Sequence, residues 1–173
     1  MAAHHDDLLI RDKAFKYFID NFNDKYSKDY DPNQIDIAFI PCSDPNIYAI
    51  PSEVFIDPEC TIMKFQTVRK KYRLEVEKFG VRRCPSNEEL KNRLIEDPPQ
   101  DIDEAKEIFE YLASREGSFD WMFINDIDFI PIRDKTRPEV IILKNPHSCF
   151  FKDQERYYFF FLLYKRKNFF SYL

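Results

Sequence analysis

The scarcity of glycine constrains this chain more than any other feature. Only two of the 173 residues are glycine, Gly80 and Gly117, where an average usage of about 7% would give roughly twelve. Phosphate-cradling loops, the dinucleotide-binding fingerprint and the nucleophile elbow need glycines at fixed positions in a short span. Enzymes of these kinds are therefore excluded. The apolar content of 44% is sufficient for a folded unit with a real core.

The cysteines give no sign of a metal centre. Four are present, namely Cys42, Cys60, Cys84 and Cys149. No two of them form a C-x-x-C pair, and only three histidines are available to complete a zinc site of four ligands. We therefore expect reduced, mostly buried thiols of an intracellular protein, with no metal and no cofactor.

The sequence carries no recognisable targeting or membrane-spanning signal. Residues 1–7 are polar and acidic, unlike the basic start and apolar stretch of a secretory signal. The longest apolar run, residues 157–164, is too short to cross a bilayer as a helix. The net charge of -5 indicates a mildly acidic surface. We expect an intracellular, cytoplasmic protein, with a nuclear location left open.

Four segments have the apolar spacing of an amphipathic helix. They are residues 11–23, 65–79, 86–96 and 102–116. Gly80 follows the second segment, where a left-handed residue often ends a helix. A capping box, Ser86 to Glu89, opens the third, and Asp101 caps the fourth. The expected buried side chains are Leu90 and Leu94 in the third helix and Ile102, Ala105, Phe109 and Leu112 in the fourth.

Short apolar runs between the helices predict two pairs of strands. The strands are expected over residues 35–41 and 47–55, and again over 127–131 and 139–143. In the first strand Ile35, Ile37 and Phe39 share one inward face, and Pro51 interrupts the second. The second pair is expected to be antiparallel.

A short repeat relates the two strand pairs. Residues 36–41 and 126–131 match at five of six positions, 90 residues apart. Each segment follows a helix with a similar aromatic spacing and precedes a strand that starts with Glu and Val. We therefore predict two partial copies of a helix–strand–strand unit.

The element order from residue 65 onward is that of a winged helix: three helices, then a strand, a loop and a strand. We predict an α+β fold with winged-helix-like helices and a small antiparallel sheet. The predicted domains are a partial first repeat over residues 1–60, a winged-helix-like unit over 61–148 and an aromatic tail over 149–173. Because the tail lacks helix or strand periodicity, we expect it to be exposed and the chain to be a fragment or a truncated gene product.

Two constellations are candidates for catalysis, and each has a simpler structural explanation. Asp126 and Asp128 could hold a divalent ion in a metal-dependent enzyme, or could form the solvent side of a strand. Cys42 could act as a nucleophile with His4 or His147, but nothing nearby would orient the base. A buried thiol is the expected role of Cys42. The chain is expected not to be an enzyme and to have no catalytic residue.

One dense basic cluster stands out in an otherwise acidic chain. It comprises Arg69, Lys70, Lys71, Arg73, Arg82 and Arg83. In a winged-helix protein such cations could face phosphates, but the expected recognition helix, residues 102–116, opens with acidic residues that repel DNA. Winged-helix folds also serve protein contacts. A protein-facing surface is therefore favoured, with nucleic-acid binding as the alternative.

Four motifs, in this order, resemble a known family. They are Ile37-Ala38-Phe39-Ile40-Pro41-Cys42, Phe79-Gly80-Val81 with Pro85, Ile108-Phe109-Glu110-Tyr111-Leu112 and Phe129-Ile130-Pro131. From about residue 14 to 150 the chain resembles a middle segment of large, uncharacterised fungal proteins related to sacsin and to plant NO VEIN-type proteins. The resemblance implies a histidine-kinase-type ATPase domain upstream, similar to that of Hsp90-class chaperones. No residue of that nucleotide site can be carried over to this chain.

These observations favour a non-catalytic interaction or scaffold module, excised from a larger sacsin-like architecture. Its expected partner is another protein or another segment of the parent polypeptide. Nucleic acid is disfavoured, and neither a membrane nor a small-molecule substrate is indicated. The alternatives are a nucleic-acid-binding winged helix that uses the basic cluster and a metal-dependent enzyme that uses Asp126 and Asp128.

Overall fold

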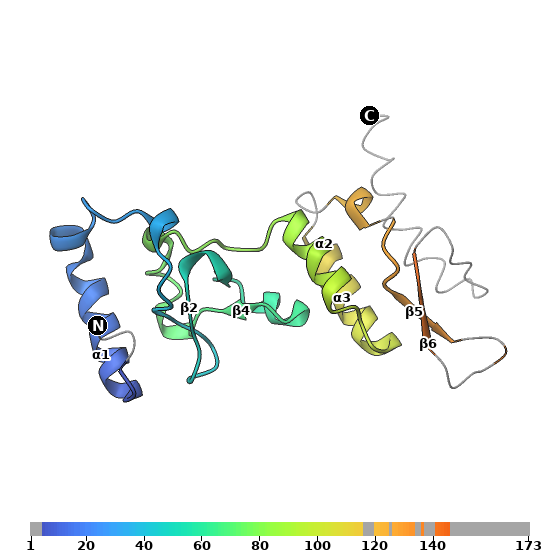
Figure 1. The fold of residues 1–173 in the computed structure, drawn as a ribbon, viewed down its shortest axis with the longest axis horizontal. Coiled ribbons are helices and arrows are strands. Elements are labelled where there is room, and N and C mark those ends of the chain that lie inside the picture. The colour runs from blue at the N-terminus through green and yellow to red at the C-terminus, as the bar shows by residue number, and fades with distance from the viewer. Residues whose placement is uncertain (1–4, 116–119, 125, 134–135, 137–140, 146–173) are drawn as a thin grey trace. The chain divides into compact units, whose positions relative to one another are not determined.

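The computed structural model describes residues 5–115, 120–124, 126–133, 136 and 141–145 (Figure 1). The chain divides into two compact units, Met1–Ser86 and Asn87–Leu173. The predicted boundary at residue 60 lies inside the first unit, because residues 54–55 pair with residues 66–67 on either side of it. The predicted first domain therefore has no separate core.

The first unit is built from helix α1, short strands and single helical turns. Its elements are α1 (Leu8–Asn21), the π-helical turn η2 (Phe22–Tyr26), η3 (Pro32–Gln34), β1 (Ile40–Pro41), β2 (Tyr48–Ala49), η4 (Pro51–Glu53), β3 (Val54–Phe55), η5 (Pro58–Met63), β4 (Gln66–Thr67), η6 (Lys70–Tyr72) and η7 (Glu77–Phe79). The helix predicted over residues 11–23 is confirmed as α1. Asp7 caps it, since the Asp7 carboxylate accepts the Leu9 N–H at 2.8 Å.

The strands of the first unit pair in two small sheets. β1 and β2 are antiparallel, whereas β3 and β4 are parallel. Single bridges extend this pairing, from Cys42 to Val68 and from Phe55 to Arg82. The chain after β4 and the chain after η7 therefore lie beside the earlier strands.

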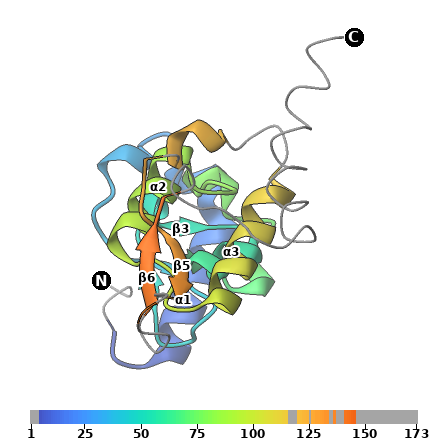
Figure 2. The same ribbon diagram turned by 90° about the vertical axis from the view of Figure 1, so that its right-hand side faces the viewer.

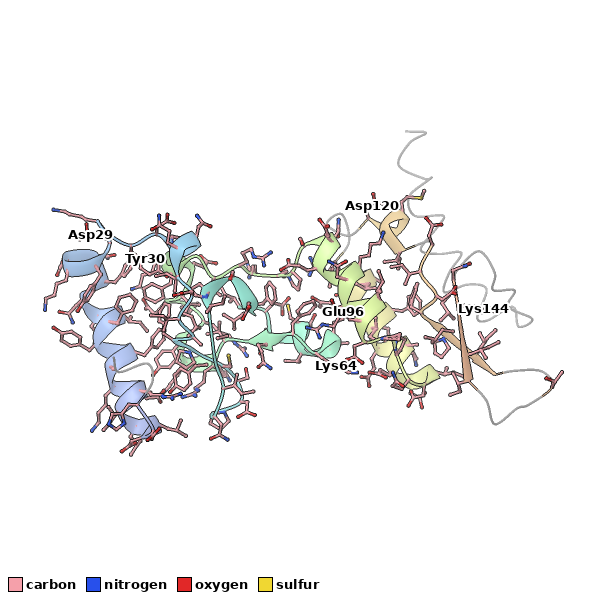
Figure 3. The ribbon with its side chains drawn as sticks, viewed as in Figure 1. Asp29, Tyr30, Lys64, Glu96, Asp120 and Lys144 are labelled. Carbon is pink, nitrogen blue, oxygen red and sulfur yellow. The ribbon has the colours of Figure 1, made fainter. Side chains whose placement is uncertain are left out.

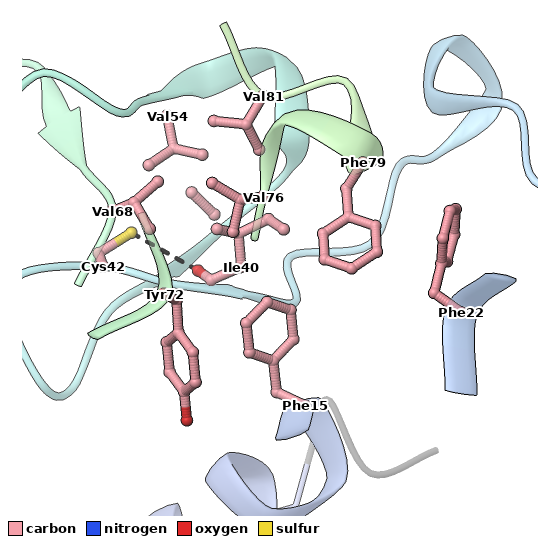
Figure 4. Close-up of a cluster of buried hydrophobic side chains, with 11 residues drawn as sticks. Phe15, Phe22, Ile40, Cys42, Val54, Val68, Tyr72, Val76, Phe79 and Val81 are labelled. Atoms are coloured by element: carbon pink, nitrogen blue, oxygen red, sulfur yellow. Dashed lines mark hydrogen bonds between the residues drawn. The ribbon is translucent and has the colours of Figure 1, made fainter. Parts of the chain in front are cut away.

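An aromatic cluster forms the core of the first unit (Figure 4). The fully buried Phe79 lies at its centre, with ring centroids 4.8 Å from Phe22 and 5.0 Å from Phe18. The edge-to-face geometry with Phe22 places a ring edge against a ring face, which is favourable electrostatically. The Tyr30 hydroxyl donates to the Phe79 carbonyl oxygen at 2.9 Å. Other buried members are Phe15, Ile40, Cys42, Ala49, Val54, Val68, Tyr72, Val76 and Val81.

The predicted helix over residues 65–79 is wrong. This segment forms β4, η6 and η7. Two of its backbone N–H groups bind earlier strands: that of Val68 donates to the Phe55 oxygen at 2.8 Å, and that of Arg69 to the Pro41 oxygen at 2.9 Å, whereas those of Tyr72 and Phe79 close single turns. Successive 3-10 turns return side chains to one side at a spacing close to that of an α-helix. The apolar residues of the stripe that are buried as predicted are Val68, Tyr72, Val76 and Phe79.

The first predicted strand pair is confirmed only in part. β1 covers the last two residues of the predicted strand over 35–41, and Ile37 is exposed instead of inward. Ahead of β1, the Phe39 N–H joins the ladder by donating to the Ala49 oxygen at 3.1 Å. Pro51 begins η4, which is why β2 and β3 belong to different sheets.

Among the described residues, left-handed backbone occurs at Gly80 and Lys64. Gly80, with φ of 80°, caps η7 in the predicted conformation, although η7 is a 3-10 turn and not the end of a long helix. A Cβ on Gly80 would lie 2.4 Å from the Pro32 Cβ, so both the backbone and the space require glycine. Lys64, with φ of 58°, closes η5 (Figure 3).

The second unit combines two helices with an antiparallel strand pair (Figure 2). Its elements are α2 (Asn87–Glu96), α3 (Ile102–Ser114), η8 (Trp121–Ile124), β5 (Ile130–Arg133) and β6 (Ile141–Lys144). Phe109 of α3 packs against Phe129, with ring centroids 5.3 Å apart. The other buried residues are Leu90, Leu94, Ala105, Ile108, Tyr111, Leu112, Ile124, Ile127 and Ile130.

Both helices predicted for this unit are confirmed, and the inward Leu90 and Leu94 are buried. The Asp101 carboxylate caps α3 by accepting the Glu104 N–H at 2.8 Å. Ile102 is exposed rather than buried, because the buried face of α3 begins one turn later, at Ala105. Residues 116–119, including the predicted exit at Gly117, lie outside the described residues.

The predicted strand over residues 127–131 begins later, at Ile130, and it pairs with β6 as predicted. Residues 139 and 140 of the other predicted strand, and the predicted tail, lie outside the described residues. Both Ile40-Pro41 and Ile130-Pro131 start the first strand of an antiparallel pair. That the two segments are copies of one unit stays a prediction.

The α+β class is confirmed by this mixture of helices and small sheets. The predicted winged-helix order required three helices from residue 65 onward. Residues 65–79 do not form one of them, so the described α-helices after residue 65 are α2 and α3. Within the described part of the chain, every helix is too short or too polar to pass through a bilayer.

Candidate functional site

The predicted basic cluster does not form one surface. Arg69 points inward, and its guanidinium donates to Asp12 Oδ1 at 2.7 Å, to the Cys42 carbonyl at 3.1 Å and to the Pro45 carbonyl at 3.0 Å. Lys71 Nζ donates to the other Asp12 oxygen at 2.6 Å, and this hydrogen bond raises the pKa of Lys71. The two cations therefore tie η6 to α1.

Other cations of the cluster are also engaged within the unit. Arg73 Nε donates to the Val68 carbonyl at 3.1 Å. Arg82 donates to the Ser52 carbonyl at 3.0 Å, and its guanidinium lies 5.1 Å from the centroid of the Phe55 ring. The exposed members of the cluster are Lys70, Lys71, Arg82 and Arg83.

Leu74 projects from the same series of turns. It is 97% exposed, more than any other large apolar side chain among the described residues. Its backbone is nevertheless ordered, because the Glu75 N–H donates to the Tyr72 oxygen at 2.9 Å and the buried Tyr72 and Val76 anchor both sides. Leu74 is therefore presented to solvent on a fixed turn.

Cys42 has the buried role expected for it. The side chain is fully buried at the end of β1, and its thiol donates to the Ile40 carbonyl at 3.7 Å (Figure 4). Burial raises the pKa of Cys42 to about 11, although the neighbouring Arg69 charge opposes the shift. A thiol with this pKa is protonated at neutral pH, which disfavours it as a nucleophile. The proposed bases, His4 and His147, lie outside the described residues.

The carboxylates of Asp126 and Asp128 are both exposed, while Ile127 and Phe129 between and after them are buried. This alternation is the one expected for the solvent side of a strand. The residues precede β5 and do not belong to it. Asp101 and Asp103 have the same spacing as Asp126 and Asp128, and Asp101 is the cap of α3.

One group of side chains that brings sulfur and oxygen atoms together is not predicted by the sequence patterns above. The ligand atoms of Asp57, Cys60 and Cys84 all lie within 4.8 Å of one another. The Cys84 thiol donates to Asp57 Oδ2 at 3.5 Å. Cys60 is fully buried, and the other two residues are half-buried.

A different search of the sequence would have found half of this group. Asp57 and Cys60 have the spacing of a C-x-x-C pair with aspartate in the first position. A search restricted to cysteine and histidine passes over such a pair. Nothing local indicates Cys84, since the fold brings it to the pair from 24 residues beyond Cys60.

A family model covers both units. The model described as "Protein of unknown function (DUF3684)" matches residues 1–165. The chain belongs to the DUF3684 family. No curated protein and no solved structure matches it. Within this DUF3684 chain, the predicted basic residues are divided between internal contacts and solvent, and the Asp57, Cys60 and Cys84 side chains converge.

Proposed function

We propose that this DUF3684 chain is a non-catalytic interaction module of a larger, sacsin-like, ATPase-associated protein. The observation that carries the proposal is Leu74, a nearly fully exposed leucine on an ordered turn. An apolar side chain on an already ordered backbone costs little further backbone entropy when it enters a partner's pocket. The motif resemblance to sacsin-related and NO VEIN-type proteins supports the larger architecture.

The charges around Leu74 indicate the chemistry of the partner. Lys70 is exposed on the same turns, and Lys71, although paired with Asp12, has a side chain that is 54% exposed. They would meet acidic side chains at the rim of a protein surface, where such charges steer association more than they strengthen it. The partner we propose is therefore a protein, or another segment of the parent polypeptide, with an apolar pocket and an acidic rim.

Photo-crosslinking tests this proposal. A photoreactive leucine analogue at position 74, in cells that express the chain, should give a discrete adduct. The matched control carries the analogue at Leu9, which is 70% exposed in the same unit. The position 74 adduct should be lost in the Lys70→Glu variant, which leaves the Lys71–Asp12 pair in place. Identical adducts from both positions, or none from position 74, would contradict the proposal.

Nucleic-acid binding is the second candidate, favoured by the exposed Lys70, Lys71, Arg82 and Arg83. It predicts duplex binding that weakens steeply with salt, because each neutralised phosphate releases counterions. A gel-shift titration at about 50 mM salt separates the two candidates, since the interaction module should leave a DNA duplex unshifted under that condition.

A further inference from the structure

We propose that Asp57, Cys60 and Cys84 form a binding site for Zn²⁺. Thiolate sulfur and carboxylate oxygen are both accepted ligands of zinc, which is usually tetrahedral. The three side chains come from two segments of the first unit that the backbone holds together. This site is independent of the interaction surface around Leu74.

The first two ligands are placed by the turn η5. Asp57 is its N-cap, with Oδ1 accepting the Glu59 N–H at 3.0 Å, while the Cys60 N–H donates to the Asp57 carbonyl at 3.3 Å. Residues three apart in a 3-10 helix lie nearly above one another. The Asp57 and Cys60 side chains therefore share one side of the turn, and the second Asp57 oxygen, Oδ2, accepts from the Cys84 thiol.

The third ligand is placed by strand pairing. The Ile56 N–H donates to the Arg82 carbonyl at 3.1 Å, and the Asp57 N–H donates to the Arg83 carbonyl at 3.0 Å. These two bonds extend the parallel pairing that begins at the bridge between Phe55 and Arg82. Cys84 comes next after Arg83 and so lies beside Asp57.

The geometry fits a tetrahedral ion. With metal–sulfur and metal–oxygen distances of about 2.3 and 2.0 Å, neighbouring ligands of a tetrahedral zinc lie about 3.5 Å apart for sulfur and oxygen and about 3.8 Å apart for two sulfurs. The distance from Cys84 Sγ to Asp57 Oδ2 is 3.5 Å, and all three ligand atoms lie within 4.8 Å of one another. The fourth position would be taken by water or by a donor from a partner.

The carboxylate distinguishes a metal site from a redox pair. A disulfide between Cys60 and Cys84 would use the two sulfurs and leave the Asp57 Oδ2 beside them without a role. A divalent cation uses all three groups and favours their ionised forms, since metal binding displaces the thiol protons. We therefore argue for the metal, and the disulfide becomes an outcome of the test.

Cobalt and zinc titrations of the reduced, metal-free full chain test the proposal. One equivalent of Co²⁺ should give a thiolate-to-cobalt charge-transfer band, and one equivalent of Zn²⁺ should abolish it with release of protons. His4, His5, His147 and Cys149 are replaced in every variant, so that these other imidazole and thiol donors do not contribute.

Two ligand variants and one matched control assign the site. Asp57→Asn keeps the N-cap acceptor but loses the carboxylate, and should weaken Zn²⁺ binding about tenfold or more. Cys84→Ser should abolish the cobalt band. Cys42→Ser removes a thiol of the same unit outside the group and should bind Zn²⁺ like the parent.

The proposal fails if the reduced parent gives no cobalt band and no zinc-dependent proton release. It also fails if Cys42→Ser lowers zinc affinity as much as Asp57→Asn does, or if the chain forms a Cys60–Cys84 disulfide in air and its reduced form binds no metal. If Cys84→Ser does not fold, the metal titrations of the parent and the zinc affinity of Asp57→Asn still test the proposal.

Discussion

At the scale of single residues, the first unit depends on a few positions where one side chain satisfies several constraints. Gly80 combines left-handed backbone with close contact to Pro32, whereas Lys64 adopts left-handed backbone with a full side chain. Cys42 fills the core as a neutral thiol beside the inward-pointing Arg69. Gly80 and Lys64 therefore differ in how much a substitution at each position should change the free energy of unfolding.

Replacement of Gly80 by alanine should lower the free energy of unfolding by about 2 kcal/mol or more. The left-handed backbone costs about 1 kcal/mol for alanine, and the new Cβ must displace Pro32, which adds about 1 kcal/mol or more. Urea unfolding measures the change. Lys64→Gly is the control and should change stability by less than about 1 kcal/mol in either direction. Equal losses in the two variants would contradict this account.

Cys42 should make the chain less stable at alkaline pH. Its pKa in the fold is about 11, above its value in the unfolded chain, so the folded state retains a proton that the unfolded state loses. The stabilisation is complete below about pH 9 and is lost as the pH rises toward 11.

Urea unfolding of the parent chain and of Cys42→Ala at pH 8 and pH 10 measures this loss. The parent should lose about 1 kcal/mol more than the variant between the two pH values. Tyr30, whose burial raises its pKa to about 12, contributes equally to both proteins and cancels in the comparison. Parallel losses in parent and variant would show that Cys42 does not titrate as argued.

At the scale of elements, the helices and the turns are stabilised by different contacts. α3 carries its own signals, an aspartate cap and an apolar stripe, within its own residues. The turns η5, η6 and η7 have local backbone bonds, but the residues between β4 and η6 are placed by bonds to distant strands, such as that from the Val68 N–H to the Phe55 oxygen. Local sequence can therefore predict α3, but it cannot predict the long-range pairing around the turns.

The cap of α3 gives a prediction for an element. Asp101→Ala should destabilise the second unit by about 1 kcal/mol, because the Glu104 N–H loses its acceptor at the helix start. Asp103→Ala is the control, since Asp103 is exposed in the first turn without capping it, and should cost about 0.5 kcal/mol or less. Chemical denaturation monitored on the second unit compares them. A larger loss in the control would reject the cap as the main local determinant.

The same difference explains what could be predicted. α1, α2 and α3 follow from spacing and caps, and the buried faces of residues 65–79 follow from apolar spacing even though the helix does not. The backbone partners of Val68 and Arg69 come from strands earlier in the chain, which no local pattern encodes. For the same reason Cys84 could not be placed beside Asp57, since that contact requires the pairing of residues 55–57 with 82–83.

At the scale of the whole molecule, the described residues of each unit form a hydrophobic core of their own. Phe79 lies at the centre of the first, and Phe109 packs against Phe129 in the second. Substitutions in the two cores should therefore be distinguishable by where they lower the protection of backbone amides.

Phe79→Leu and Phe109→Leu form a reciprocal pair for this test. Each should cost about 1–2 kcal/mol through lost contacts and residual space. Hydrogen exchange should show the loss on amides of the first unit for Phe79→Leu and on amides of α3 for Phe109→Leu. Uniform losses across the chain in both variants would mean that the units open only together.

Because the chain has a single tryptophan, the unfolding of its two units can be distinguished by optical spectroscopy. Trp121 lies in η8 of the second unit, so tryptophan fluorescence reports on that unit. The Phe and Tyr cluster around Phe79 belongs to the first unit and absorbs without contributing a tryptophan signal. A near-ultraviolet dichroism change that occurs without a change in fluorescence would therefore record the first unit melting while the second remains folded.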